Sequence, residues 1–127
     1  TCANIVGKDL NNLVNIYFKE GTLTNTGGIV IIEDKCPNKI IYGSSFWIER
    51  YNNGNWDRLE SKGNYFFNDM AYYADENGIL EMEQNWDYLY GSLDKGTYRL
   101  VKDVSFDADT PMTKDDIYYI WVEFEID

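Results

Sequence analysis

The sequence contains no histidine, and this absence removes several kinds of chemistry at once. Histidine is the side chain that most often acts as a general base near neutral pH, and it is the commonest metal ligand. Without it, neither a Ser-His nor a Cys-His nucleophile can be assembled. We therefore expect no catalytic residues, no metal site and no cofactor, and we predict that the protein is not an enzyme.

Long apolar runs and excess positive charge are missing as well. The longest purely aliphatic run covers residues 29–32, far short of the roughly 20 residues that a membrane helix needs. We expect no transmembrane segment in this chain. Eleven Lys and Arg residues against 22 Asp and Glu give a net charge of -11. Because the field of such a chain repels phosphate groups, we expect no nucleic-acid partner.

Cysteine is scarce, with only Cys2 and Cys36 in the chain. In an exported protein the two could form one disulfide, and two buried thiols are the alternative. Cys2 could also be the lipid-bearing first residue of a lipoprotein, although Thr1 departs from the Gly, Ala or Ser usual before such a cysteine. The chain opens without an initiator methionine, so an upstream segment could have been removed.

What the sequence does contain is apolar residues at alternate positions, the pattern of a half-buried β-strand. Residues 14–18 alternate in this way, and so do residues 118–126. Residues 27–35, GGIVIIEDK, instead contain a continuous β-branched run at residues 29–32, which predicts a central strand buried on both faces. Because 127 residues that are 44% apolar can bury one core, we predict one domain over residues 14–127, preceded by an N-terminal extension over residues 1–13.

Turn signals separate these strands. Asn53-Gly54 lies between two short strand patterns and predicts a tight hairpin, since Asn-Gly accepts the positive φ angles of such turns. About seven short strands with regular turns indicate an all-β sandwich or barrel, with helix only in short turns. We expect nine alternating apolar residues to be buried, namely Val14, Ile16, Ile48, Leu80, Met82, Trp86, Leu100, Val122 and Phe124.

Tyr98 carries a more specific signal, because it precedes Leu100 by two residues in the segment LDKGTYRL. Immunoglobulin-like sandwiches have a tyrosine in this relation to an inward position, with its hydroxyl bonded to nearby backbone. The wider pattern resembles the bacterial immunoglobulin-like (Big-type) domains of exported proteins and lipoproteins of Gram-positive bacteria. The resemblance covers residues 14–126 and is carried by Tyr42-Gly43, Tyr90-Gly91, Phe46, Ile48, Trp56, Trp86, Gly96, Tyr98, Arg99 and Lys102.

This resemblance implies a two-sheet antiparallel immunoglobulin-like β-sandwich on a secreted or surface-attached protein, with no catalytic residues to carry over. We accordingly expect a non-catalytic extracellular or cell-surface module for interaction or structure, lipid-anchored or not, with an unknown protein or glycan partner. A carbohydrate-binding module is the alternative, because Trp and Tyr rings on a sheet face can stack on sugars. An enzyme is a third class, which the absence of histidine disfavours.

Acidic residues are so abundant that paired carboxylates arise by chance. Glu81 and Glu83 share a strand face, as the acid and base of a glycosidase could, but we interpret them as part of a solvated face. Residues 103–116 include five aspartates, and oxygen-rich loops can bind calcium. This segment lacks the glycine and the terminal glutamate of an EF-hand loop, so we interpret it as a solvated connection between two strands.

Strand parity identifies one candidate ligand surface. If the strands that contain Ile48, Leu100 and Val122 lie side by side, their sequence neighbours point outward. The outward set is Trp47, Glu49, Tyr51, Arg99, Val101, Asp103, Tyr119, Trp121 and Glu123, and the candidate ligand-binding residues among them are Trp47, Tyr51, Arg99, Tyr119 and Trp121. The alternative is that these residues form cross-strand pairs with Arg99 stacked on a ring, or that residues 63–74 cover them.

Overall fold

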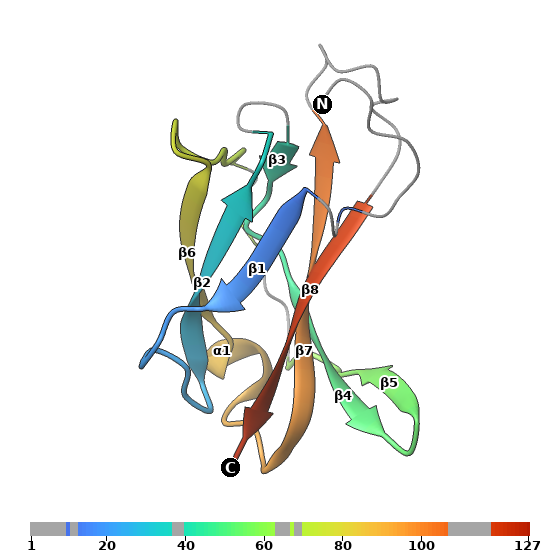
Figure 1. Cartoon of the computed structure of the whole chain (residues 1–127). Helices are drawn as coiled ribbons and strands as arrows, with labels where there is room; N and C mark the ends of the chain where they lie inside the picture. Colours follow the sequence, from blue (N-terminus) through green and yellow to red (C-terminus); the bar gives the residue numbers. More distant parts are fainter. Residues whose placement is uncertain (1–9, 11–12, 37–39, 63–66, 68–69, 107–117) are drawn as a thin grey trace.

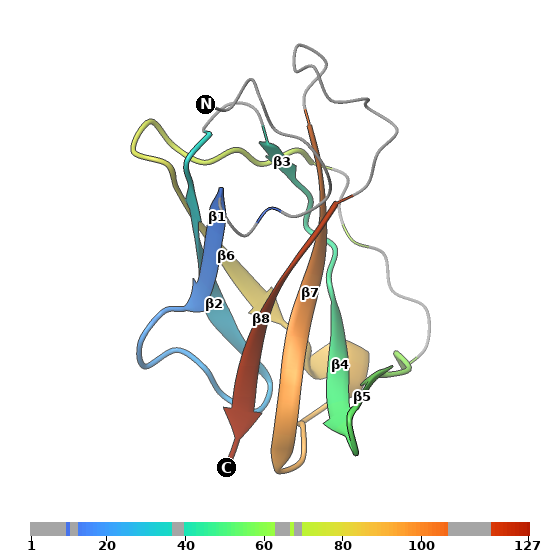
Figure 2. The ribbon, with the colours of Figure 1, turned by 45° about the vertical axis from the view of Figure 1, so that its right-hand side comes forward.

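The computed structural model describes residues 10, 13–36, 40–62, 67, 70–106 and 118–127. In these residues the chain forms eight β-strands and one short helix. The strands make two antiparallel sheets that pack face to face (Figures 1 and 2). The predicted all-β sandwich of immunoglobulin type is confirmed. The helix is four residues long, in agreement with the prediction that helix occurs only in short turns.

The smaller sheet has three strands in the order β1-β2-β6. In the larger, five-stranded sheet, β7 pairs with β3 and β4 along one edge and with β8 along the other, and β5 pairs with β4. The elements are β1 (Val14–Phe18), β2 (Gly27–Asp34), β3 (Ile40–Tyr42), β4 (Trp47–Asn52), β5 (Asn55–Arg58), β6 (Ile79–Asn85), α1 (Asp87–Tyr90), β7 (Gly96–Phe106) and β8 (Tyr118–Ile126).

The predicted hairpin forms between β4 and β5. Asn53 has a φ of 50° and Gly54 a φ of 91°, and the flanking residues Asn52 and Asn55 pair across the turn. Two successive positive φ angles give the turn a twist that matches its strands, which is why Asn-Gly is favoured there. The hairpin carries β5 to the edge of the larger sheet and places Trp56 opposite Tyr51.

The core lies between the two sheets and contains the apolar residues expected from alternation. Of the nine residues predicted to be buried, six are buried, and Ile16, Leu80 and Val122 are partly buried and packed against the core. At the centre, Trp86 is fully buried and donates a hydrogen bond from its indole Nε1 to the carbonyl oxygen of Asn25, 2.8 Å away. Its one polar atom is therefore satisfied, as burial of an indole requires.

The prediction that β2 is buried on both faces is wrong. Val30, Ile32 and Asp34 are buried, whereas Ile29 and Ile31 on the other face are only partly buried. A two-layer sandwich covers each sheet on its inner side alone, so even a strand with a continuous apolar sequence keeps a solvent-facing side.

Tyr98 forms the predicted corner. Its ring is buried, and its hydroxyl donates to the carbonyl oxygen of Asp94 at 2.7 Å. The ring stacks on Phe124 of β8, with centroids 5.7 Å apart. The tyrosine thus fastens the turn before β7 to the core while keeping its hydroxyl hydrogen-bonded.

Candidate functional site

The outward side of the larger sheet, here called the outer face, is ordered in rows that run across the strands. Figure 2 shows β8, β7, β4 and β5 side by side. One row, which we call the charge row, alternates in sign across these four strands. The register pairs Arg58 with Glu49, Glu49 with Arg99, and Arg99 with Glu123. Paired residues in a sheet share a face, so the four side chains form one line.

The centre of the charge row is tightly bonded. The guanidinium of Arg99 lies 2.6 Å from Oε1 of Glu49. The other oxygen of Glu49 accepts a hydrogen bond from the indole Nε1 of Trp47 at 2.7 Å. Both charged groups are largely shielded from solvent, with side-chain exposures of 24% for Arg99 and 14% for Glu49. Partly buried pairs of this kind are screened less by salt than exposed ones.

The next row is apolar and consists of Trp47, Val101 and Trp121. Val101 lies on the outward face, as parity predicted, but it is only 4% exposed. The physical reason is its position between two tryptophans, because large indoles on both neighbouring strands cover a smaller side chain. Tyr119, which is paired with Asp103 in the neighbouring row, packs its ring edge-on against Trp47 at 5.7 Å.

Arginines stack on the aromatic rings of this face. Arg99 lies 4.6 Å from the ring centre of Trp56 and 5.5 Å from that of Trp121, and Arg58 lies 4.4 Å from that of Trp47. Contacts of the kind given by the alternative interpretation, in which the arginines and the aromatic residues stabilise the sheet across strands, are therefore present at Trp47, Trp56 and Trp121. Tyr51, Tyr119 and Trp121 nevertheless keep 47%, 46% and 42% of their surface exposed.

All five candidate residues thus lie on one sheet face, as parity predicted, but two further members were missed. Trp56 packs edge-on against Tyr51 at 5.1 Å, and Arg58 belongs to the charge row. The sequence did contain the signal for both. A two-residue hairpin turn at Asn53-Gly54 pairs Asn52 with Asn55, and counting outward from that pair places Trp56 beside Tyr51.

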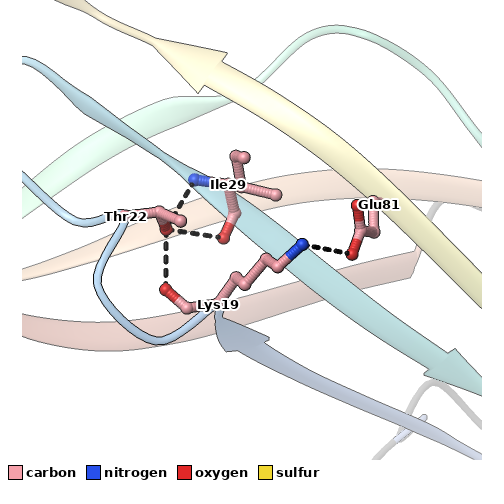
Figure 3. Close-up of polar contacts among 4 residues, drawn as sticks. All are labelled: Lys19, Thr22, Ile29 and Glu81. Carbon is pink, nitrogen blue, oxygen red and sulfur yellow. Dashed lines mark hydrogen bonds and ion pairs between the residues drawn. The ribbon is translucent and has the colours of Figure 1, made fainter.

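The outer side of the smaller sheet has a different character. Lys19, just after β1, forms an ion pair of 3.2 Å with Glu81 of β6. Thr22 donates a hydrogen bond to the carbonyl oxygen of Lys19 and accepts one from the amide of Ile29 (Figure 3). Glu81 and Glu83 are both exposed, in agreement with their interpretation as a solvated face. This side therefore has scattered charges and hydrogen bonds within a turn, whereas the outer face of the larger sheet has stacked aromatic rings.

Lys102 is a further residue whose position the sequence did not predict. Its side chain points into the core from β7 and is fully buried. The ammonium donates to the carbonyl oxygen of Ser45 at 3.1 Å and to Oε1 of Gln84 in the opposite sheet at 2.9 Å. Burial lowers the pKa of Lys102 from 10.5 to about 8. Gln84 also lines an open pocket of about 360 Å³ beside β6, which includes the rings of Phe46 and Tyr72 in its wall.

Several predictions concern residues outside the described ranges. Cys36 is buried, but Cys2 lies outside those ranges, so their disulfide stays a prediction. The acidic connection is described only up to residue 106, and segment 63–74 only in part. Among the described residues, no group of three or more Asp, Glu or Cys side chains is arranged to hold a metal ion. The helix in this part of the chain is too short to span a bilayer.

The fold, with its two antiparallel sheets and its tyrosine corner, defines an immunoglobulin-like domain. The family described as "Bacterial Ig-like domain" matches residues 11–118. The chain therefore belongs to the bacterial Ig-like domain family. No curated protein and no solved structure gives a significant match. Bacterial Ig-like domains are generally non-catalytic, and membership indicates a structural or interaction module.

Proposed function

We propose that this domain is an extracellular interaction module that binds a protein partner through the outer face of its larger sheet. The observation that carries the proposal is the gathering of three of the four tryptophans and two of the three arginines of the chain on that face. Trp, Tyr and Arg are the residues most enriched among the side chains that dominate protein–protein binding.

The geometry of the face supports a protein partner. Stacking of Arg99 and Arg58 holds the rings in fixed orientations, so little side-chain entropy is lost on binding. Exposed rings at Tyr119 and Trp121 stand beside the charge row. An apolar centre with charged groups nearby supplies both contact area and orientation, which are the two requirements of a specific interface.

A photo-cross-linking experiment tests this proposal before the partner is identified. A photoreactive phenylalanine analogue replaces Tyr119 on the outer face or, as the matched control, Tyr17, an exposed tyrosine of the smaller sheet. We expect irradiation of producing cells to give a cross-linked polypeptide from position 119 and none from position 17. Cross-links from position 17 alone, or from neither position, would contradict the assignment of the outer face.

The extracellular setting is a separate part of the proposal. Bacterial Ig-like domains are often found on extracellular proteins, and a disulfide between Cys2 and Cys36 would suit an oxidising compartment. We expect a protease added to intact cells to remove the domain while a cytoplasmic marker stays whole. Protection of the domain until the cells are lysed would contradict an exposed location, and labelling with a fatty-acid analogue would test lipid anchoring at Cys2.

Carbohydrate binding is the second candidate function. It is favoured by the exposed rings of Tyr51, Tyr119 and Trp121, which lie on a sheet face where sugars could stack. A glycan array probed with the protein and with the variant Tyr119→Ser/Trp121→Ser separates the two functions. Glycan binding that the double variant loses would establish this function, and an array without signal would exclude it for the glycans tested.

A further inference from the structure

We propose that the partner of the outer face is a second copy of this chain, bound face to face about a twofold axis. This inference rests on the proposed function of the same face and names its partner. The observation behind it is the alternation of charge in the charge row, Arg58, Glu49, Arg99 and Glu123, across four neighbouring strands.

An alternating row of even length is complementary to itself when it is reversed. A twofold axis parallel to the strands, midway between β4 and β7, places β5 of one copy over β8 of its partner and β4 over β7. Arg58 then faces Glu123 of the other copy, and Glu49 faces Arg99. A twofold axis along the row would instead place each charge over the same charge of the other copy. Because like charges repel, the axis parallel to the strands is favoured.

The apolar row fits the same axis. Because β4 of one copy lies over β7 of the other, Trp47 lies opposite the smaller Val101, which the indoles of its own copy largely cover, on both sides of the axis. Two tryptophans facing each other at this position would compete for the same space. Sheets packed face to face lie about 10 Å apart, a separation that interdigitated large and small side chains fill.

The charge of the whole molecule points to the same face. At a net charge of -11, two copies repel each other over most of their surface. The charge row holds two positive and two negative groups and is therefore neutral. Within this row the charges that meet across the axis are of opposite sign, so the row itself adds no repulsion between the two acidic chains.

The size of the face sets the expected affinity. Four strands and about six residues per strand cover roughly 19 by 20 Å. This area, roughly 380 Å² in projection, is about half of the roughly 800 Å² that each partner buries in a stable specific interface, and it corresponds to a weak, transient one. We therefore expect a reversible dimer with a Kd in the micromolar range.

Charge reversal provides the test, because Arg58 and Glu123 lie on the two outer strands of the row, roughly 14 Å apart within one copy. Sedimentation equilibrium of the purified chain from about 1 to about 500 µM measures the dimer. We expect Arg58→Glu or Glu123→Arg to weaken it at least about tenfold. The double variant Arg58→Glu/Glu123→Arg should restore it, because each reversed charge meets the other only across the twofold axis.

The matched control is Lys95→Glu, which changes the net charge as much as Arg58→Glu does but lies in the turn before β7. This variant should dimerise nearly as well as the unmodified chain. Circular dichroism verifies that each variant is folded. Since the two single reversals are on different strands, misfolding of one variant leaves the other as a test. A monomer at every concentration, or a double variant no better than the singles, would overturn the inference. If position 119 still cross-links to a chain of different mass, the proposed function survives that failure.

Discussion

At the scale of single residues, Lys102 shows how the core tolerates a charge. Its ammonium donates hydrogen bonds to Ser45, in the connection between β3 and β4, and to Gln84 of the smaller sheet, and so links β7 to the opposite layer. Asp103, the next residue, favours the charged form, but desolvation outweighs it. The lysine is therefore held by polar partners while burial still disfavours its charge.

The titration of Lys102 predicts a rise in stability at alkaline pH. Its pKa is about 8 in the folded chain against an ordinary 10.5, so the unfolded chain binds more protons between these values and the free energy of unfolding rises with pH. From pH 8 to about pH 9.5 we expect a gain on the order of 1 to 2 kcal/mol in urea titrations. Lys102→Met should remove most of this rise, and a rise that persists in the variant would assign it to other groups.

Tyr98 gives a second prediction at this scale. The variant Tyr98→Phe keeps the buried ring but loses the hydrogen bond to the carbonyl oxygen of Asp94. We expect a loss of about 1 kcal/mol in the free energy of unfolding. Tyr119→Phe is the control, because the ring of Tyr119 is exposed, and its cost should stay below about 0.5 kcal/mol. Equal effects of the two variants would argue against the corner.

At the scale of elements, the sequence predicts what local chemistry decides. Asn53-Gly54 encodes its hairpin in two residues, and the nine alternating apolar residues all reach the core or its margin. The burial of Val101 could not be predicted in the same way, because it depends on which side chains flank β7 in space. Lys102 has the parity of a core position, but only the opposite sheet supplies the amide that makes its burial tolerable.

The glycines of the turns give a prediction at the scale of elements, with a control glycine in the same chain. Gly54 and Gly78 both have positive φ, but a Cβ at Gly54 would meet open space, whereas one at Gly78 would collide with the carbonyl oxygen of Asp34. We expect Gly54→Ala to cost about 1 kcal/mol from backbone strain alone. Gly78→Ala should cost more than about 2 kcal/mol. Gly43→Ala, with ordinary φ and no close neighbour, should be nearly neutral in the same thermal unfolding assay.

At the scale of the whole molecule, the candidate face arises from the joining of distant segments. β4 ends at Asn52 and β7 begins only at Gly96, yet the outward residues of β4, β7 and β8 form continuous rows. Parity fixed which residues point outward, and the resemblance to immunoglobulin-like domains supplied the order of the strands. The alternation of charge became visible only with the register, because a shift of one residue would move every side chain to the other face.

The disulfide is the prediction that belongs to this scale. A bond between Cys2 and Cys36 would enclose about 33 residues and stabilise the fold by roughly 3 to 4 kcal/mol through the entropy of the unfolded chain. Mass spectrometry of protein from an oxidising compartment should find two hydrogens fewer than in the reduced chain, and a reductant should lower the unfolding temperature. Two free thiols in that protein would contradict the bond.

The position of β8 has a consequence for when this domain can fold. β8 is the last strand of the sandwich, and it supplies Tyr118 and Ile120 to one part of the core and Phe124 to the other. Neither part is complete before this strand arrives, and the pairings that link distant segments make such sandwiches slow folders. The two parts of the core therefore cannot be completed until the residues of β8 have been synthesised, and an unfolded polypeptide is the form that a protein-export channel can thread.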